Sequence, residues 1–323
     1  MLRVARSMLF AALAAVFVQA HAQAPWPSKP VRLVVSQAAG GTPDIVARMI
    51  ADRLTRALGQ QFVVDNRPGA GNIIGAQAVA HAPADGYTLF FATAAALVSN
   101  PFTFKSLPYD PDRDFTPVSM VGKIHFFVLV NPKVPAKTLP ELIALEKAQP
   151  GKLAFASDGP RNFSGMLGEW INKLAGTHML LVPYAKMPEG VQDTIAGRTQ
   201  VVILAVPSAA PRMKSGDLRA IAVSAAKRTP GYENIPAVAE TFPGFDFTGW
   251  FVIVAPTGTP SAVVQRLNRE MDKILKDPEV VQKLREFGMF TDGAETPEAT
   301  GEYIRAQRAA WGKMVKEIGL KPE

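Results

Sequence analysis

The stretch V-R-L-V-V-S-Q-A-A-G-G-T-P-D-I-V-A-R-M, residues 31–49, decides the fold of this chain. It begins with a β-branched run typical of a buried strand and ends with apolar residues at helical spacing. Between them lies a loop that holds Gly40 and Gly41. Proline suits the start of a helix, so Pro43 predicts a helix N-terminus with Thr42 as its N-cap. A strand, a glycine loop and a helix start in this order favour a receptor for an anion such as a carboxylate, because the first N–H groups of a helix lack partners within it.

The same stretch lacks the common phosphate-binding motifs. No G-x-G-x-x-G is present, and no Gly-Lys-Ser/Thr follows the glycines. An ordinary connection between a strand and a helix is therefore an equally good interpretation of this stretch on its own. If the loop does bind a ligand, Gly40 and Gly41 are expected to act through close backbone approach and φ freedom rather than through side-chain chemistry.

Residues 1–24 are typical of a secretory signal. Two arginines precede an apolar run, residues 8–18, and small residues then offer cleavage near Ala22 or Ala24. An uncleaved membrane anchor is the alternative, but the apolar run is shorter than the roughly 20 residues that a membrane span needs. We therefore predict an exported, soluble protein.

The composition excludes several classes of function. The chain has no cysteine, so it has no lipoprotein anchor, disulfide, thiolate metal site or cysteine nucleophile. Its formal net charge of +7 falls to +5 without the two arginines of the signal, and its charges are scattered. Such a distribution does not predict nucleic-acid binding. The four histidines are isolated from one another, so we expect no metal site and no cofactor.

Strand and helix patterns alternate along the chain, which predicts an α/β fold with parallel sheets and covering helices. The pattern restarts after Val118, and a Pro-Gly junction at residues 243–244 precedes a last buried strand. We therefore predict two α/β domains, one of residues 25–123 plus 246–323 and the other of residues 124–245. The strands are expected at 31–35, 61–65, 87–92, 118–130 (a strand pair or a crossing strand), 153–157, 180–184, 201–206, 218–224 and 247–255, and the helices from 42 and at 73–81, 141–149, 165–175, 189–196, 208–215, 260–276 and 297–318.

The polar residues form no catalytic pattern. No G-x-S-x-G motif exists, and Ser157 and Ser164 have no histidine nearby in the sequence. Of Asp44, Asp158 and Asp193, two lie at expected helix starts or loops, where capping explains a carboxylate. We predict no catalytic residues and no enzyme.

Residues 157–164 repeat the opening design of strand, glycine-bearing loop and helix. If this loop and residues 37–44 face each other across a cleft, they present two sets of backbone N–H groups. Such a pair would hold a small anion without a buried positive side chain.

The ordered motifs of the chain are similar to those of one family. They are V-R-L-V-V-…-G-G-T-P-D-I-V-A-R, V-V-D-N-R-P-G-A-G-N-I-I-G-A, A-D-G-Y-T-L, L-P-Y-D-P-D-R-D-F-T-P-V, V-P-Y, G-D-L-R-A-I-A-V and A-P-T-G-T-P. Over residues 26–323 this set resembles the Bug family, the TctC-like substrate-binding proteins of tripartite tricarboxylate transporters. The resemblance implies a periplasmic-binding-protein-like (Venus flytrap) fold with a ligand cleft between the domains. It also implies a monomer in the periplasm that captures a small carboxylate and delivers it to the membrane permease subunits of the transporter.

The predicted ligand-binding residues follow from the loops and from this resemblance. They are Gln37, Ala39, Gly40, Gly41, Thr42, Asp44, Thr93, Ser157, Asp158, Asn162, Ser164, Tyr184 and Leu204. A periplasmic sensor that reports its ligand to a two-component system is the alternative function, and the sequence does not separate it from transport.

Four positions depart from the family pattern. Ala96, Leu97, Gly165 and Leu204 stand where the family more often has polar side chains. A ligand that is polar at both ends, such as citrate, would then leave buried atoms unpaired, at about 1–3 kcal/mol each. We therefore expect a monocarboxylate with an apolar or aromatic body.

Overall fold

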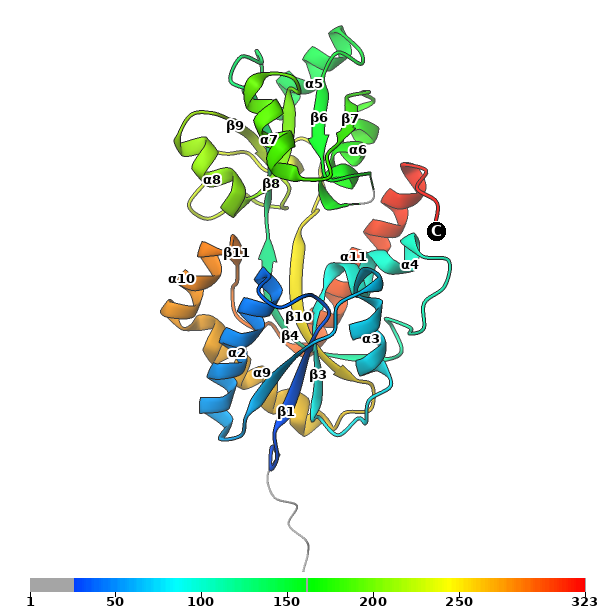
Figure 1. The fold of residues 1–323 in the computed structure, drawn as a ribbon, viewed down its shortest axis with the longest axis vertical. Coiled ribbons are helices and arrows are strands. Elements are labelled where there is room, and N and C mark those ends of the chain that lie inside the picture. Colours follow the sequence, from blue (N-terminus) through cyan, green and yellow to red (C-terminus); the bar gives the residue numbers. More distant parts are fainter. Residues whose placement is uncertain (1–25, 161, 323) are drawn as a thin grey trace, which may run out of the picture.

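Two α/β lobes lie one above the other in the computed structural model, which describes residues 26–160 and 162–322 (Figure 1). The predicted signal peptide therefore lies outside the described residues. Within those two ranges, the structure has no helix that is both long enough and apolar enough to cross a membrane.

The lower lobe is built on a six-stranded sheet of order β11-β4-β10-β3-β1-β2. Strands β2, β1 and β3 are parallel, whereas β10 runs antiparallel to β3 and β4. Alternate side chains of β1 face opposite sides, with Val34 in one core and Leu33 and Val35 in the other. The strands are β1 (Val31–Val35), β2 (Phe62–Asn66), β3 (Thr88–Thr93), β4 (Phe115–Ile124), β10 (Gly249–Pro256) and β11 (Met289–Phe290).

Helices cover both faces of the lower sheet. Those that bury side chains in one core are α2 (Thr42–Leu58), α9 (Ser261–Lys276) and α10 (Pro278–Glu286), and those on the opposite face are α3 (Ile73–Ala80) and α11 (Pro297–Glu317). Three short helical segments follow β2 and β3, namely η1 (Ala70–Asn72), η2 (Ala95–Ser99) and α4 (Asn100–Thr103).

The upper lobe has a five-stranded sheet of order β7-β6-β8-β5-β9. Its β7, β6 and β8 are parallel, and β5 is antiparallel to β8 and β9. The strands are β5 (Phe126–Val130), β6 (Ala154–Ser157), β7 (Leu180–Pro183), β8 (Val201–Ala205) and β9 (Arg219–Val223). The helices are α5 (Leu139–Ala148), α6 (Phe163–Ala175), α7 (Met187–Ala196), α8 (Val206–Lys214) and the short η3 (Val238–Glu240).

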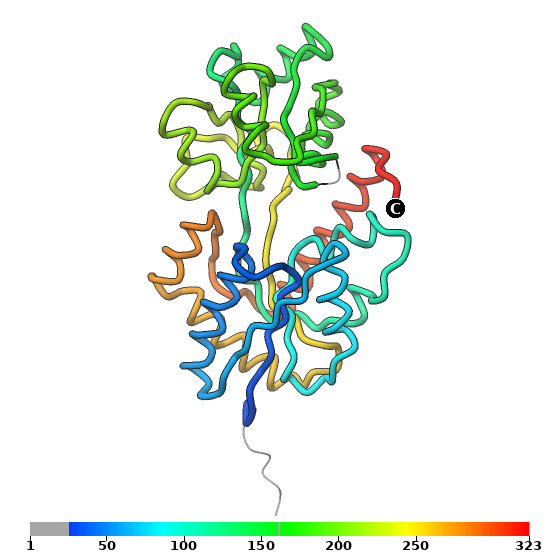
Figure 2. The backbone as a smooth tube through the Cα atoms, viewed as in Figure 1, coloured from blue at the N-terminus to red at the C-terminus, as the bar shows by residue number. Residues whose placement is uncertain are grey.

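Two stretches of chain join the lobes side by side. A single residue, His125, separates β4 of the lower sheet from β5 of the upper sheet. The returning chain pairs Gly249 with Ile124, while the N–H of Phe247 donates to the carbonyl of Ser224 in the upper lobe at 2.9 Å. Both connections are visible between the lobes in Figure 2. The expected strand at 118–130 is thus two strands in different sheets, while the boundaries of the two domains stay a prediction.

The start of α2 and three short elements differ from the expectations. The N-cap of α2 is Gly41, so the prediction of Thr42 as the N-cap was wrong, and Pro43 lies at the second helical position. Strand β11 depends on pairing with the distant Lys123 and Ile124, which no local pattern reveals. Helices η2 and α4 occupy residues 95–103, for which no helix was expected.

Candidate functional site

Two buried hydroxyl groups lie just after β1 and at the end of β3, which are neighbours in the lower sheet. Ser36 and Thr93 are 2% and 6% exposed, and neither hydroxyl has a hydrogen-bond partner among residues 26–160 and 162–322. The side-chain oxygen of Gln37 is also buried without a partner. Ligands of α/β sheets bind outside the carboxyl ends of the strands, and an unpaired buried polar group costs about 1–3 kcal/mol. These three groups therefore mark the lower part of a candidate ligand site.

Asp44 organises the loop between β1 and α2. Its carboxylate accepts the N–H of Gly40 at 2.9 Å, forms an ion pair with Arg48 at 2.9 Å and accepts the amide of Asn66 at 2.9 Å. Asn66 also donates to the carbonyl of Gln37 at 3.0 Å. Burial alone would raise the pKa of Asp44, but the bonds from Arg48, Gly40 and Asn66 outweigh burial and hold this pKa below its usual value. These contacts give Asp44 a role in shaping the loop, and its contact with a ligand stays a prediction.

The two glycines of this loop differ in conformation. Gly40 has φ +85°, which glycine adopts without strain, whereas Gly41 has an ordinary φ of −77°. A Cβ atom on Gly41 would make only ordinary contacts, the nearest at 3.6 Å. The expectation of φ freedom is thus confirmed for Gly40 and was wrong for Gly41. Ala39 and both glycines are exposed, and Thr42 is half-buried.

A left-handed turn at residues 69–72 lies beside this loop and was not predicted. Ala70 and Asn72 have φ values of +46° and +77°, which cost about 1–2 kcal/mol for residues with a Cβ atom. The buried side-chain amide of Asn100 donates to the carbonyl of Gly71 at 2.8 Å and so helps to hold the turn. Strained backbone of this kind concentrates at ligand-binding sites.

The loop after β6 in the upper lobe is closed by its own side chains. Ser157 and Ser164 are buried and their hydroxyl oxygens lie 3.1 Å apart. The hydroxyl of Ser164 also donates to the carboxylate of Asp158, and the amide of Asn162 donates to the carbonyl of Asp158 at 2.6 Å. Asp158 and Asn162 are exposed, so they are the predicted residues of this loop that solvent reaches.

Gly165 has a structural reason to lack a side chain. A Cβ atom there would lie 2.0 Å from the carbonyl oxygen of Gly159, so the first turn of α6 packs directly against the loop. Close packing of this loop therefore explains the glycine at this position.

Tyr184 and Leu204 are engaged inside the upper lobe. The hydroxyl of Tyr184 donates to the carboxylate of Asp193 in α7 at 2.7 Å. Leu204 is 6% exposed and lies in the core between the upper sheet and helices α7 and α8. The contacts that each makes to a ligand stay predictions.

The predicted residues thus gather in two places. Those of the lower lobe lie at the carboxyl ends of β1 and β3 and at the start of α2, which Figure 1 places at the top of that lobe. Those of the 157–164 loop lie at the bottom of the upper lobe (Figure 1). Among the described residues, no three histidine, aspartate or glutamate side chains gather into a possible metal site.

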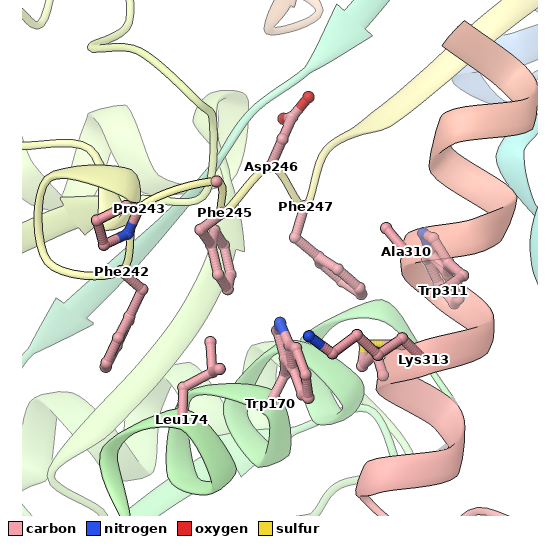
Figure 3. A pocket seen from close by; sticks show the side chains of 12 residues that line it. Trp170, Leu174, Phe242, Pro243, Phe245, Asp246, Phe247, Ala310, Trp311 and Lys313 are labelled. Carbon is pink, nitrogen blue, oxygen red and sulfur yellow. The ribbon is translucent and has the colours of Figure 1, made fainter. Parts of the chain in front are cut away.

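A separate hollow of about 190 Å³ lies beside the connections between the lobes (Figure 3). Sequence reasoning missed it, although the segment F-P-G-F-D-F at residues 242–247 is an aromatic signal that is visible in the sequence. None of the predicted ligand residues lines it. The lining residues are Trp170, Leu174, Phe242, Pro243, Gly244, Phe245, Asp246, Phe247, Ala310, Trp311, Lys313 and Met314.

Comparisons with known proteins match most of the chain. Residues 46–320 match the family described as the tripartite tricarboxylate transporter family receptor, TctC. A UPF0065 protein of Bordetella bronchiseptica is 37% identical over 319 residues, which cover 98% of this chain and 94% of that protein. Protein BugT of Bordetella pertussis is 34% identical over 298 residues, which cover 92% of this chain and 91% of that protein.

Solved structures show the same fold. An R. palustris protein solved with adipate is 33% identical, with a TM-score of 0.74 over 92% of this chain and 100% of that one. MatC from Rhodopseudomonas palustris with bound malate is 28% identical, with a TM-score of 0.69 over 90% of this chain and 100% of that one. A TctC solute-binding protein from Polaromonas, at 21% identity, supports the fold alone, with a TM-score of 0.82 over 90% and 99% of the two chains.

These matches confirm the predicted fold of two α/β domains of the periplasmic-binding-protein type, and the chain belongs to the TctC family of tripartite tricarboxylate transporter receptors.

Proposed function

We propose that this protein is a periplasmic solute-binding protein that captures a small carboxylate between its two lobes. The observation that carries this proposal is the pair of buried, unpaired hydroxyl groups of Ser36 and Thr93 at neighbouring strand ends. Two relatives with the same fold hold the carboxylates adipate and malate.

The chemistry of the lower lobe suits a carboxylate. A hydroxyl group can donate one hydrogen bond, and a carboxylate offers two oxygens that accept several. The start of α2 adds the partial positive charge of a helix N-terminus, and Arg48 offsets the negative charge of Asp44. By strand alternation Ser36 faces the side of the sheet that α3 covers and Thr93 faces the side that α2 covers. A ligand oxygen that accepts from either hydroxyl at this sheet edge would remove one unpaired buried group.

The upper lobe would contact the same ligand through the exposed loop before α6, where the amide of Asn162 can donate to an anion. The carboxylate of Asp158 accepts from Ser164 and would shape this loop. Because the two loops belong to different lobes, a ligand that touches both favours a closed arrangement of the lobes over an open one. A monocarboxylate with an apolar or aromatic body remains our expectation for the ligand, because Ala96, Leu97 and Leu204 lack the polar groups that the family more often has there. The three side chains are buried in the cores, so they bear on the ligand only through this loss of polar groups.

The remaining parts of the proposal concern the cell. We infer that a signal peptide cleaved near Ala22 or Ala24 directs the chain to the periplasm, where it acts as a monomer and not as an enzyme. It would deliver its ligand to the membrane permease subunits of a tripartite transporter. The second candidate, a ligand sensor for a two-component system, uses the same binding step and differs only in the receiving protein.

A ligand screen of the mature protein tests the proposal. Thermal shift against a carboxylate library, followed by calorimetry with adipate, malate, citrate and benzoate, should identify a carboxylate that binds in a one-to-one complex. A ligand at about 100 times its dissociation constant should raise the free energy of unfolding by roughly 2.7 kcal/mol. Mass spectrometry of the ligand after incubation should recover it unchanged.

The proposal would be overturned if no carboxylate binds, or if a ligand binds equally well to the Ser36→Ala/Thr93→Val double variant. Conversion of the ligand during incubation would instead show that the protein is an enzyme. Tight citrate binding without any binding of monocarboxylates would refute only the expectation about the body of the ligand.

A further inference from the structure

The hollow beside the connections between the lobes is walled by parts of the chain far apart in sequence. Helix α6 of the upper lobe supplies Trp170 and Leu174, helix α11 of the lower lobe supplies Trp311 and Lys313, and the returning connection supplies residues 242–247. A molecule in this hollow would therefore touch both lobes and one of the chain segments that join them.

The walls are mostly apolar and rich in aromatic rings. The rings of Phe247 and Trp311 stack with centroids 4.8 Å apart, and the ring of Phe245 lies 6.5 Å from that of Phe247. Trp170 is half-buried, and Leu174 is 37% exposed, which is unusual for a leucine beside a core. Trp170 and Leu174 form the uncovered side of the hollow, because Phe245, Phe247 and Trp311 are at most 5% exposed. An apolar molecule gains free energy when it displaces water from that side.

The charges at the hollow favour an anion. Lys313 extends from α11 toward Trp170, whereas the carboxylate of Asp246 points away from the rings (Figure 3). Asp246 is held by weak hydrogen bonds from Thr248 and Gln307, each of 3.4 Å. Within the part of the chain that the structure describes, the ammonium group of Lys313 forms an ion pair with Glu317 at 3.9 Å, and both groups are in contact with solvent. An ammonium group has three donors, so it can bind a second anion as well.

We propose that this hollow is a second ligand site, which takes a small aromatic monocarboxylate of about the size of benzoate. The ring would stack among Trp170, Phe245 and Phe247, and the carboxylate would accept from Lys313. A cavity of about 150 Å³ lined by apolar residues binds benzene, so a hollow of about 190 Å³ has room for a ring with one carboxylate. A dicarboxylate would place its second charge among the aromatic rings, and the described lining residues include no cation besides Lys313 to pair with it.

This site would be coupled to the cleft between the lobes. An occupant in contact with α6, α11 and the connection stabilises the arrangement of the lobes in which all three enclose it. Coupling of two ligands through one conformational equilibrium is reciprocal. The aromatic acid would change the protein's affinity for the cleft ligand by some factor, and the cleft ligand would change the protein's affinity for the aromatic acid by the same factor.

Indole N–H signals in a two-dimensional NMR spectrum of the full mature protein test the site directly. The Ser36→Ala/Thr93→Val double variant serves as the background, because it lacks the hydroxyls proposed for the cleft. Benzoate should shift the signals of Trp170 and Trp311 in a saturable way and leave that of Trp26 unchanged, since Trp26 packs against Phe62 and Tyr87 at the other end of the lower lobe. Trp→Phe variants assign the signals.

Matched variants test the role of charge. Lys313→Gln should weaken benzoate binding roughly fivefold and leave the binding of neutral benzamide unchanged, as expected for an ion pair in contact with solvent. Lys316→Gln, an exposed lysine of the same helix outside the hollow, should leave both affinities unchanged.

Three outcomes would overturn the site. One is the absence of a saturable shift at Trp170 and Trp311. Another is an equal loss of benzoate binding in the Lys316→Gln protein. The third is benzoate binding to the natural protein that disappears in the double variant, which would assign benzoate to the cleft and leave the proposed function intact.

Discussion

The ring of Phe163 stacks on the ring of Phe126, with centroids 4.0 Å apart and 20° between the planes. Phe126 is the first residue of β5, directly after the chain enters the upper lobe, and Phe163 is the first residue of α6, between Asn162 and Ser164 of the candidate site. The ring of Phe163 also lies 4.4 Å from that of Phe247 in the returning connection. One side chain thus joins a candidate ligand loop to both connections between the lobes.

We predict that Phe163→Leu lowers both stability and ligand affinity. Leucine keeps an apolar side chain but loses the ring contacts, and an aromatic pair contributes about 0.5–1.5 kcal/mol beyond its buried area. A double-mutant cycle of Phe126→Leu and Phe163→Leu, measured by urea unfolding, should therefore give a coupling energy of about that size. Calorimetry should show weaker carboxylate binding in the Phe163 variant.

The pair of Phe127 and Tyr232 is the control for this cycle. Their rings lie 5.1 Å apart, and Phe127 belongs to the core on the opposite face of the upper sheet from Phe126 and Phe163. A cycle at this pair should show coupling in stability with no change in ligand affinity. Equal loss of affinity from both pairs would show that Phe163 acts through general stability alone.

Ser36→Ala and Thr93→Val are predicted to change stability and binding in opposite directions. Both hydroxyls are buried without partners, so their removal should leave the free energy of unfolding unchanged or raise it by about 1 kcal/mol. The same changes should weaken carboxylate binding by about 1–3 kcal/mol each, because the ligand loses a donor. Urea unfolding without ligand and calorimetry with ligand measure the two effects.

Ser119→Ala is the matched control for these variants. The hydroxyl of Ser119 is also fully buried but donates to the carbonyl of Met120 at 2.7 Å. This variant should lose stability and keep its affinity. A loss of stability in the Ser36 and Thr93 variants that matches the control would mean that their hydroxyls serve the fold rather than a ligand.

Sequence patterns predicted most of the fold because its long strands and helices carry strong local signals. The β-branched run of β1 and the amphipathic α9 and α11 are examples: the bounds of β1 match the expected ones, and those of α9 and α11 differ by one residue at one end. Features set by distant contacts were missed. Strand β11 exists only through its pairing with β4, and the left-handed turn at 69–72 is held in part by Asn100, which lies far along the chain.

The sequence predicted which loops form the candidate site but not which side-chain atoms in them lack hydrogen-bond partners. The strand, glycine loop and helix pattern located the region around Gly40, but it gave no reason to select Ser36. Ser36 stands out only because its hydroxyl is buried without a partner, which is a property of the folded lobe. Its position directly after a buried strand was the signal that the sequence offered.

Gly40 and Gly41 allow a test that separates backbone strain from ligand contact. Gly40→Ala should lower the free energy of unfolding by about 1–2 kcal/mol, because its φ of +85° is unfavourable for alanine. Gly41→Val should leave stability nearly unchanged, since its φ is ordinary and a Cβ atom fits, yet it should abolish carboxylate binding by blocking the loop. Unchanged affinity in the folded Gly41 variant would remove this loop from the site.

The last prediction concerns His125, the residue between β4 and β5. Its ring stacks on Phe290 at 4.8 Å, and its Nδ1 lies 2.9 Å from the hydroxyl oxygen of Thr229. Burial lowers the pKa of His125 to about 4. The positive charge of Lys123 adds a smaller lowering of this pKa, and the negative charge of Asp292 opposes it. The folded protein therefore keeps this imidazole neutral at pH values where the unfolded chain, with a pKa of about 6.5, is protonated.

The contribution of His125 to the free energy of unfolding is fully present above pH 6.5 and is lost as the pH falls toward 4. In this range the unfolded chain binds a proton at His125 more readily than the folded protein does. The pKa difference corresponds to roughly 3 kcal/mol over that range. His125→Gln, whose amide can still reach Thr229, should reduce the loss of stability between pH 7 and pH 4.5, as measured by urea unfolding. His178→Gln, at an exposed histidine of the upper lobe, should follow the natural protein. Parallel pH profiles for the natural and His125 proteins would show that this imidazole has nearly the same pKa in the folded and unfolded states, so that burial at the connection has little effect on it.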